Sequence, residues 1–223
     1  MPSWSNDSEL FQMMRKDLFS AVLGDVMDTM GLTHQFLSPT VKPIKDDMVI
    51  AGRAMPVLEE DIFIGGAEEP FGLMFDALDD LKPNEIYLAT GAKPNYALWG
   101  GLMSTRAKIL GAAGAVLDGY HRDTSEILEL GFPCFSMGSY AQDQGVRGKV
   151  VQYRCRVKTL NRVVVEPGDI VFGDLDGVVI VPRTKEQEII EAAVDKVNGE
   201  NKVREAIEKG VSSKDAFHKY GIM

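Results

Sequence analysis

The residues with the clearest chemical potential lie in segment 118–126 (DGYHRDTSE). A strand is expected to end at Asp118, so the following residues lie at the carboxyl edge of a sheet, where open α/β folds bind ligands. Arg122 offers a planar fork that matches a carboxylate. Asp123 offers the hard oxygen ligands that Mg²⁺ or Mn²⁺ takes, and Glu126 shares its face if a helix has begun. An Asp N-cap with a surface ion pair explains the same residues equally well.

A second segment of interest is 96–105 (YALWGGLMST), in which Gly100 and Gly101 precede an expected helix. Backbone N–H groups at a helix start are unpaired and carry partial positive charge, which suits a carboxylate or phosphate. A tight turn that needs positive φ explains paired glycines too, and for so short a motif this second explanation is favoured.

The elements that must position these residues follow from hydrophobic spacing. The pattern predicts a helix over 8–30 with Ser8 as N-cap, and a strand over 48–57 that ends at Pro56. The further expected elements are a helix over 71–81, a strand over 85–90, a helix over 102–110, a strand over 115–118, helical turns over 126–130 and a strand over 133–137. This alternation predicts an α/β layered core.

The second half is richer in strands, which are expected at 150–159, 163–165, 170–172 and 178–181. The charged stretch 184–209 predicts one long helix, or two broken near Asn198 and Gly199. We therefore expect a single α/β catalytic domain over 1–183. A helical C-terminal extension over 184–223 would pack on that domain or on a neighbouring subunit.

Composition excludes several classes of protein. The chain of 223 residues has a net charge of −9, which disfavours nucleic-acid binding. Neither a signal peptide nor an apolar run long enough to span a membrane is found, so a cytoplasmic protein without membrane contact is expected. Cys134 and Cys155 are expected to be free thiols. His34, His121 and His218 lie too far apart in sequence for a zinc-hydrolase motif, and no glycine-rich nucleotide loop of a methyltransferase is present.

The combined spacing resembles that of a known family. Gly101, twenty further residues, and then Arg122, Asp123 and Glu126 form a pattern similar to the signature of the 4-hydroxy-4-methyl-2-oxoglutarate aldolases, which are grouped with regulators of ribonuclease E activity. Segments 99–103 (WGGLM), 111–119 (GAAGAVLDG) and 173–182 (GDLDGVVIVP) resemble further parts of that family. The resemblance implies a layered αββα sandwich with a helical tail, and it covers most of the chain from about Asp25 onward.

The resemblance also implies roles for individual residues. Backbone amides of Gly100, Gly101, Leu102 and Met103, together with Arg122, would hold the carboxylate of a small 2-oxo acid. Asp123 would bind a divalent cation, Mg²⁺ or Mn²⁺, directly, and Glu126 would bind it through water. The cation would stabilise a pyruvate-type enolate in an aldolase or decarboxylase reaction, so Arg122 and Asp123 are the expected catalytic residues.

One position departs from the family pattern. Active members carry Asp or Glu where this chain has Gly101, so the proton donor is open, with Tyr120, His121 or a water as substitutes. Two alternative functions also stay open: a regulatory binding protein, and a metal-dependent dehydratase or isomerase of a hydroxy or sugar acid. The resemblance implies a homotrimer or a homohexamer, in which Glu200 of the tail is the candidate to reach a neighbour's metal site.

Overall fold

The computed structural model describes residues 4–62 and 70–221, and in this part of the chain it confirms the α/β class. The main sheet has the strand order β1-β8-β6-β4-β2-β12-β13, and β9 pairs with β2 and β3 beside this path. Its strands are β1 (Lys42–Pro43), β2 (Ile50–Asp61), β3 (Phe71–Gly72), β4 (Glu85–Thr90), β6 (Gly114–Leu117), β8 (Cys134–Ser136), β9 (Gly148–Tyr153), β12 (Ile170–Asp174) and β13 (Gly177–Val181). Two small separate pairs are β5 (Ala97–Trp99) with β7 (Tyr120–His121), and β10 (Val157–Lys158) with β11 (Val164–Val165).

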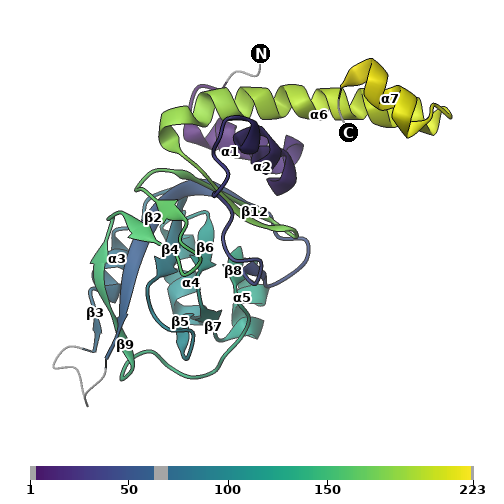
Figure 1. Cartoon of the computed structure of the whole chain (residues 1–223). Helices are drawn as coiled ribbons and strands as arrows, with labels where there is room; N and C mark the ends of the chain where they lie inside the picture. The colour runs from purple at the N-terminus through teal and green to yellow at the C-terminus, as the bar shows by residue number, and fades with distance from the viewer. Residues whose placement is uncertain (1–3, 63–69, 222–223) are drawn as a thin grey trace.

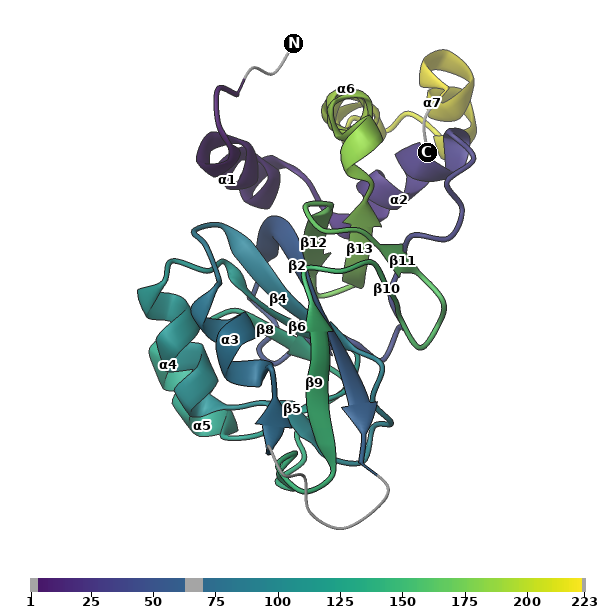
Figure 2. The same ribbon diagram turned by 90° about the vertical axis from the view of Figure 1, so that its left-hand side faces the viewer.

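The helices cover both outer faces of this sheet. They are α1 (Asp7–Asp17), α2 (Ser20–Thr29), α3 (Met74–Asp79), α4 (Gly101–Ile109), α5 (Thr124–Leu130), α6 (Glu186–Glu208) and α7 (Ser213–Tyr220). Figures 1 and 2 show α3, α4 and α5 on one side and α1, α2 and α6 on the other.

Alternate residues along each strand face different cores, as a period of two requires. In β4, Tyr87 packs in the cluster under α3–α5, whereas Ile86 and Leu88 pack in an inner cluster with β10–β13. In β12, Val171 joins that inner cluster, whereas Phe172 packs under α1, α2 and α6. The inner cluster therefore lies between two halves of one curved sheet, and this confirms the αββα layering.

The strand β2 is longer than expected, because it continues past Pro56 to Asp61. Its antiparallel neighbour is β12 up to Arg53 and β9 from Val57 onward. Pro56 lies at the junction between these two neighbours, so its missing N–H disrupts neither antiparallel ladder. The expectation that the strand ends at Pro56 was wrong for this reason.

The expected single helix over 8–30 is two helices, α1 and α2, separated by an extended Leu18 and Phe19. The carboxylate of Asp174 accepts hydrogen bonds from Ser20 N and Ser20 Oγ, both at 2.7 Å, and so caps α2 from a strand that lies 154 residues later in the sequence. The N-cap of α1 is Asn6 rather than Ser8, and its side chain accepts a bond from the N–H of Glu9 at 3.0 Å.

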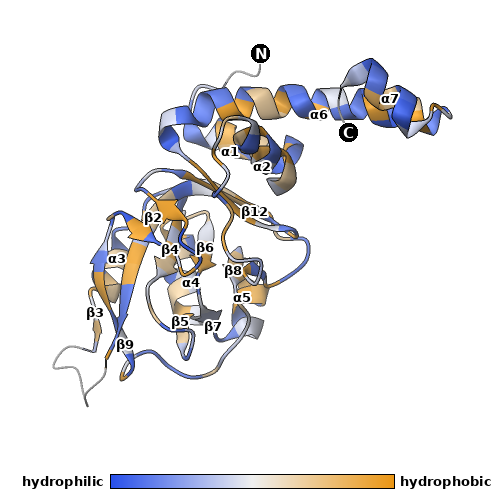
Figure 3. Ribbon diagram, viewed as in Figure 1, coloured by the Kyte–Doolittle hydropathy of each residue, from blue (hydrophilic) through white to orange (hydrophobic). Residues whose placement is uncertain are grey.

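The C-terminal region begins with α6, which runs unbroken through Asn198 and Gly199. Its first half packs Ile189, Ile190 and Ala193 against α1 and α2, and α7 folds back on its far end (Figure 1). Hydrophilic residues cover much of α6 in Figure 3. Within the described ranges, no helix has both the length and the apolar character to cross a bilayer.

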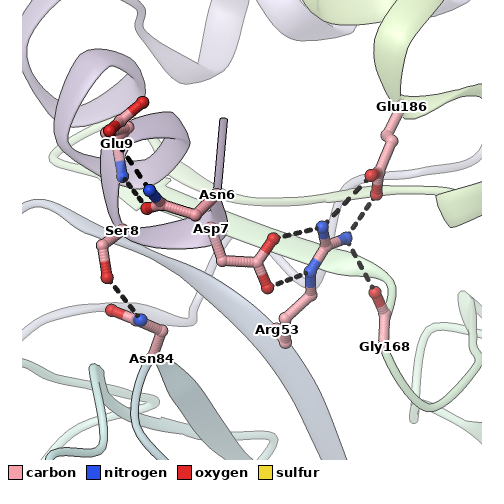
Figure 4. Close-up of polar contacts among 8 residues, drawn as sticks. All are labelled: Asn6, Asp7, Ser8, Glu9, Arg53, Asn84, Gly168 and Glu186. Atoms are coloured by element: carbon pink, nitrogen blue, oxygen red, sulfur yellow. Dashed lines mark hydrogen bonds and ion pairs between the residues drawn. The ribbon is translucent and has the colours of Figure 1, made fainter. Parts of the chain in front are cut away.

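A half-buried arginine, Arg53, joins three of these elements (Figure 4). Arg53 of β2 donates to both carboxylate oxygens of Asp7 in α1, at 2.6 and 2.9 Å, to Glu186 in α6, and to the carbonyl oxygen of Gly168 at 3.2 Å. The hydrogen bonds from Arg53 lower the pKa of Asp7. Charge-assisted bidentate contacts of this kind fix α1 and α6 on the sheet.

Candidate functional site

A short parallel pair of strands brings the two predicted segments together. Strands β5 and β7 pair, and the N–H of Arg122 donates to the carbonyl oxygen of Trp99 at 2.9 Å. Since Gly100 follows β5 and Arg122 follows β7, the start of α4 lies beside the start of α5. The structure therefore brings Gly100, Gly101, Arg122 and Asp123 together, although the two segments lie some twenty residues apart.

Asp123 occupies the N-cap position of α5 in a left-handed conformation, with φ 59° and ψ 39°. Its side chain makes no capping bond to α5; instead its Oδ2 accepts a hydrogen bond from the N–H of Gly101 at 3.1 Å. The N-cap explanation thus accounts for the position of Asp123 but not for its side chain. A left-handed conformation costs on the order of 1 kcal/mol for a residue with a Cβ, and such strain clusters at functional sites.

Arg122 is held by a residue that the sequence did not indicate. Its Nη1 pairs with Asp143 Oδ1 at 3.0 Å, and its Nε lies 3.7 Å from Asp123 Oδ2. Asp143 is fixed in turn by the N–H of Gly145, which donates to Asp143 Oδ2 at 2.8 Å, and by Arg147 on its carbonyl oxygen at 2.9 Å. The Arg122 side chain keeps 39% of its surface exposed, so its fork is accessible to a ligand.

The paired glycines leave room for two carboxylates. A Cβ on Gly100 would lie 2.6 Å from Asp123 Oδ2, and a Cβ on Gly101 would lie 2.0 Å from Glu126 Oε2. Gly100 has φ −156° and Gly101 is the first residue of α4, so positive φ is not the reason for these glycines. Asp123 accepts the hydrogen bond from the N–H of Gly101, whereas the N–H groups of Gly100, Leu102 and Met103 have no acceptor among residues 4–62 and 70–221.

Tyr120 and His121, the two residues of this segment that are candidates for the proton donor, are both held by neighbouring side chains. His121 is 3% exposed, and its ring nitrogens contact Ser136 Oγ at 2.7 Å and Thr124 Oγ1 at 2.9 Å. Burial lowers the pKa of His121. Both nitrogens are engaged by hydroxyls, so His121 supports β7 rather than offering a proton. Tyr120 packs its ring edge-to-face against Tyr140, with centroids 5.7 Å apart.

A buried acid, Glu59, holds one residue of the cavity wall from behind. Glu59 is 2% exposed at a register shift in β2, and its Oε2 accepts a bond from Gln144 Nε2 at 3.0 Å. Glu59 Oε1 and the hydroxyl of Tyr87 have no partner among the described residues. Burial raises the pKa of Glu59 to about 8. A neutral Glu59 therefore holds Gln144 in place beside Asp143.

A cavity of about 250 Å³ lies beside Arg122 and Asp123. Five predicted residues line it, namely Gly100, Leu102, Met103, Arg122 and Asp123, whereas Gly101 and Glu126 do not. Asp143 and Gln144 complete its polar end. The rest of the wall comes from Phe71, Met74, Phe75, Leu78, Ala97 and Trp99. Met74, Phe75 and Leu78 of this wall lie on α3, which is shorter than the helix expected over 71–81, because Phe71 and Gly72 pair with β9 as β3. The sequence pattern did not indicate that this helix faces the site.

The donor set suits a hard divalent cation. The Asp123 side chain is 42% exposed, and the carboxylate of Glu126, from α5, lies against Gly101 of the same turn. Mg²⁺ commonly takes one or two carboxylates and retains several waters. Clusters of three or more His, Cys, Asp or Glu side chains able to hold a metal are absent from residues 4–62 and 70–221, so a cage made wholly of protein ligands is not part of the described structure.

Comparison with known proteins gives consistent matches over this region. A model of the RraA-like family, described as aldolase/RraA, matches residues 20–180. An uncharacterized protein of Methanocaldococcus jannaschii is 32% identical over 180 residues, covering 80% of this chain and 83% of the relative. A protein of Halalkalibacterium halodurans with the provisional name 4-hydroxy-4-methyl-2-oxoglutarate aldolase is 28% identical over 200 residues, or 87% of each chain.

Among solved structures, RraAS2 of Streptomyces coelicolor is described as an unusual member of the RNase ES inhibitor RraA protein family. It is 25% identical to this chain and superposes with a TM-score of 0.76 over 91% of this chain and 99% of its own. The names of these relatives thus include both an aldolase and an inhibitor of a ribonuclease.

Proposed function

The chain belongs to the RraA-like family, and from this premise we propose that it is a divalent-metal-dependent lyase acting on a small 2-oxo acid, as an aldolase or a decarboxylase. The observation that carries the proposal is the convergence of Arg122, Asp123 and the start of α4 at one end of a cavity. An inhibitor that binds a protein surface has no need of a strained aspartate beside an accessible arginine.

Arg122 and the turn of α4 would bind the substrate carboxylate. The guanidinium fork of Arg122 matches a carboxylate, and Asp143 holds the guanidinium through Nη1. The unpaired N–H groups of Leu102 and Met103 stand at the positive end of α4. These contacts would fix the carboxylate and leave the neighbouring 2-oxo group beside Asp123.

Asp123 would hold Mg²⁺ or Mn²⁺ directly, with Glu126 contributing through water. The cation, when bound, supplies Lewis-acid stabilisation of the enolate that remains after C–C cleavage. Asp123 stays oriented for this task because the N–H of Gly101 binds its Oδ2. Arg122 adds positive charge on the same side, which favours the anionic state.

Active members of the family are expected to carry an acid at the position of Gly101, and in this chain a carboxylate from another residue lies there. The carboxylate of Glu126 occupies the space that a side chain at position 101 would need. We expect that His121 is not the substitute, because the hydroxyls of Ser136 and Thr124 contact both of its ring nitrogens. Glu126 thus places a carboxylate beside the turn without a side chain on Gly101.

The test is a screen of 2-oxo acids and 4-hydroxy-2-oxo acids with added Mg²⁺ or Mn²⁺, followed by pyruvate release. We expect turnover for at least one substrate, and loss of it in Asp123→Asn. The matched control is Asp79→Asn, because Asp79 is an exposed aspartate that pairs with Arg106 on the surface. Absence of turnover over the whole screen, with the protein folded, would instead favour the regulatory binding role or a dehydratase or isomerase reaction.

A further inference from the structure

The cavity beside Arg122 has two chemically distinct ends. Its polar end carries Arg122, Asp123, Asp143 and Gln144. Beyond these residues the wall is made by carbon atoms of aromatic and aliphatic side chains: Phe71, Met74, Phe75, Leu78, Trp99 and Met103. A ligand held by its carboxylate at Arg122 would therefore place the rest of its length against apolar surface.

The apolar part is a formed surface rather than a chance exposure of side chains. Trp99, Leu78 and Met74 are only 2%, 6% and 7% exposed and belong to the core under α3–α5. Trp99 is fixed further by the hydrogen bond from its Nε1 to Ser104 Oγ at 2.7 Å. Phe75, at 58% exposed, forms the rim. A volume of about 250 Å³ is just below that of common small-molecule pockets, so the occupant is small.

The charges beside this wall disfavour a second acidic group on the ligand. Asp143 contributes a carboxylate at the same end as Arg122, and the guanidinium of Arg122 already contacts both Asp143 and Asp123. A second carboxylate entering the apolar part would lose its hydration without gaining a cationic partner, which is costly. An alkyl or aryl group would gain free energy from the same burial.

We propose that this cavity receives an apolar substituent of the substrate, so that the preferred substrates are monocarboxylic 2-oxo acids with an aliphatic or aromatic group. This inference rests on the aldolase form of the proposed function, because a decarboxylation that leaves a pyruvate enolate requires a second carboxylate on the substrate. For an aldol cleavage the substrate is a 4-hydroxy-2-oxo acid with that group on C4. The C3–C4 bond breaks and leaves its electron pair on C3 as the enolate. The 4-hydroxyl loses its proton to give an apolar aldehyde, and C3 takes up a proton to give pyruvate.

The experiment measures binding through Trp99. The chain contains two tryptophans, so Trp4→Phe leaves Trp99 of the cavity wall as the single reporter. The probes are pyruvate, 2-oxobutanoate, 2-oxopentanoate and 2-oxohexanoate, with 2-oxoglutarate as the dicarboxylic comparison, all in the presence of Mg²⁺. Each buried methylene should lower Kd by about fourfold, so the three added methylenes should lower it roughly 60-fold from pyruvate to 2-oxohexanoate. We expect 2-oxoglutarate to bind at least about tenfold more weakly than 2-oxopentanoate.

A pair of matched variants tests whether the apolar wall causes the dependence of Kd on chain length. Phe75→Ser should weaken 2-oxohexanoate binding about fivefold and leave pyruvate unchanged. Phe217→Ser is the control, because Phe217 is similarly exposed at 49% but lies on α7, remote from the cavity. A Kd that does not depend on chain length would overturn the inference. So would a Phe75→Ser protein that changes its oligomeric state in light scattering but keeps the slope, since the wall would then be a contact between subunits.

The inference and the proposed function fail in different ways. A steep dependence of Kd on chain length without lyase turnover for any substrate would retain the apolar cavity and remove the lyase. Lyase turnover with a Kd that does not depend on chain length would retain the lyase and remove the apolar cavity.

Discussion

Replacement of Glu59 by Gln tests the state of the buried acid behind the cavity. Gln has nearly the same shape as the neutral acid and keeps an oxygen that accepts the bond from Gln144 Nε2. It lacks a proton to lose, whereas burial raises the pKa of Glu59 from 4.5 to about 8. The variant should therefore fold like the wild type but respond differently to pH.

The magnitude follows from proton linkage. Between pH 4.5 and pH 8 the unfolded chain has released the proton that folded Glu59 still holds. The stability that this proton provides is fully present below pH 4.5 and is lost as pH rises to about 8. With these two values, wild-type stability should fall by about 2–3 kcal/mol between pH 6 and pH 9 through this group alone. Glu59→Gln should not show that part of the decline.

The assay is urea denaturation followed by circular dichroism at several pH values. The free energy of unfolding of Glu59→Gln, relative to wild type, should rise by about 2–3 kcal/mol from pH 6 to pH 9. Glu188→Gln is the control, because Glu188 is exposed on α6. Parallel stability curves for wild type and Glu59→Gln over this range would refute the reasoning, since they would mean that Glu59 does not retain its proton in the folded state.

Three further predictions concern the site and the assembly. Arg122→Ala should lower kcat/KM about 100-fold with little change in metal affinity, because a charge-assisted bidentate contact with the substrate carboxylate is lost. Arg106→Ala is the control. Unchanged kinetics in Arg122→Ala would mean that Arg122 does not bind the substrate and is an ordinary surface residue. Gly101→Asp should displace the exposed carboxylate of Glu126, because its Cβ would lie 2.0 Å from Glu126 Oε2, and should therefore weaken Mn²⁺ binding severalfold; unchanged metal affinity in this variant would contradict the role of Glu126 in holding metal-bound water. Light scattering should give a trimer or a dimer of trimers, since the far end of α6 with α7 projects beyond the body of the protein (Figure 1), and a monomer at micromolar concentration would contradict it.

Local sequence patterns were sufficient for much of the layered core. The strand expected over 85–90 is β4 with the same bounds, because β-branched and aromatic residues stand between a Pro-Asn turn and Gly91. The helix expected over 102–110 begins one residue earlier and ends one residue earlier, as α4. Periodicity and glycine punctuation act within a few residues, so they specify such elements well.

Elements that depend on distant partners could not be predicted in this way. The break between α1 and α2 is stabilised by Asp174, which follows Ser20 by 154 residues. The continuation of β2 past Pro56 depends on where β12 and β9 meet it. Neither the sequence around Leu18 nor that around Pro56 contains these partners, so local patterns gave the wrong boundaries.

In the candidate site, too, residues marked by a local signal could be predicted and residues that depend on a distant partner could not. Arg122 and Asp123 stood out because they follow a strand end and match a family pattern, and their closeness to Gly100 agrees with that expectation. Asp143 did not stand out, because its role depends on a loop that folds back across the site to reach Arg122. The residues 143–145 (DQG) are a polar turn signal that could have marked this loop, but nothing in them indicates its partner.

The most direct test of the central claim is the metal dependence of pyruvate release. Wild type and Asp123→Asn would be stripped with chelator and then titrated with Mn²⁺ or Mg²⁺, using the best substrate of the screen. Asn tolerates the left-handed conformation that residue 123 adopts, so this variant should retain the fold. The account predicts no turnover in stripped wild type, saturable recovery on addition of metal, and no recovery in Asp123→Asn. Full turnover of the wild type in excess chelator would contradict it.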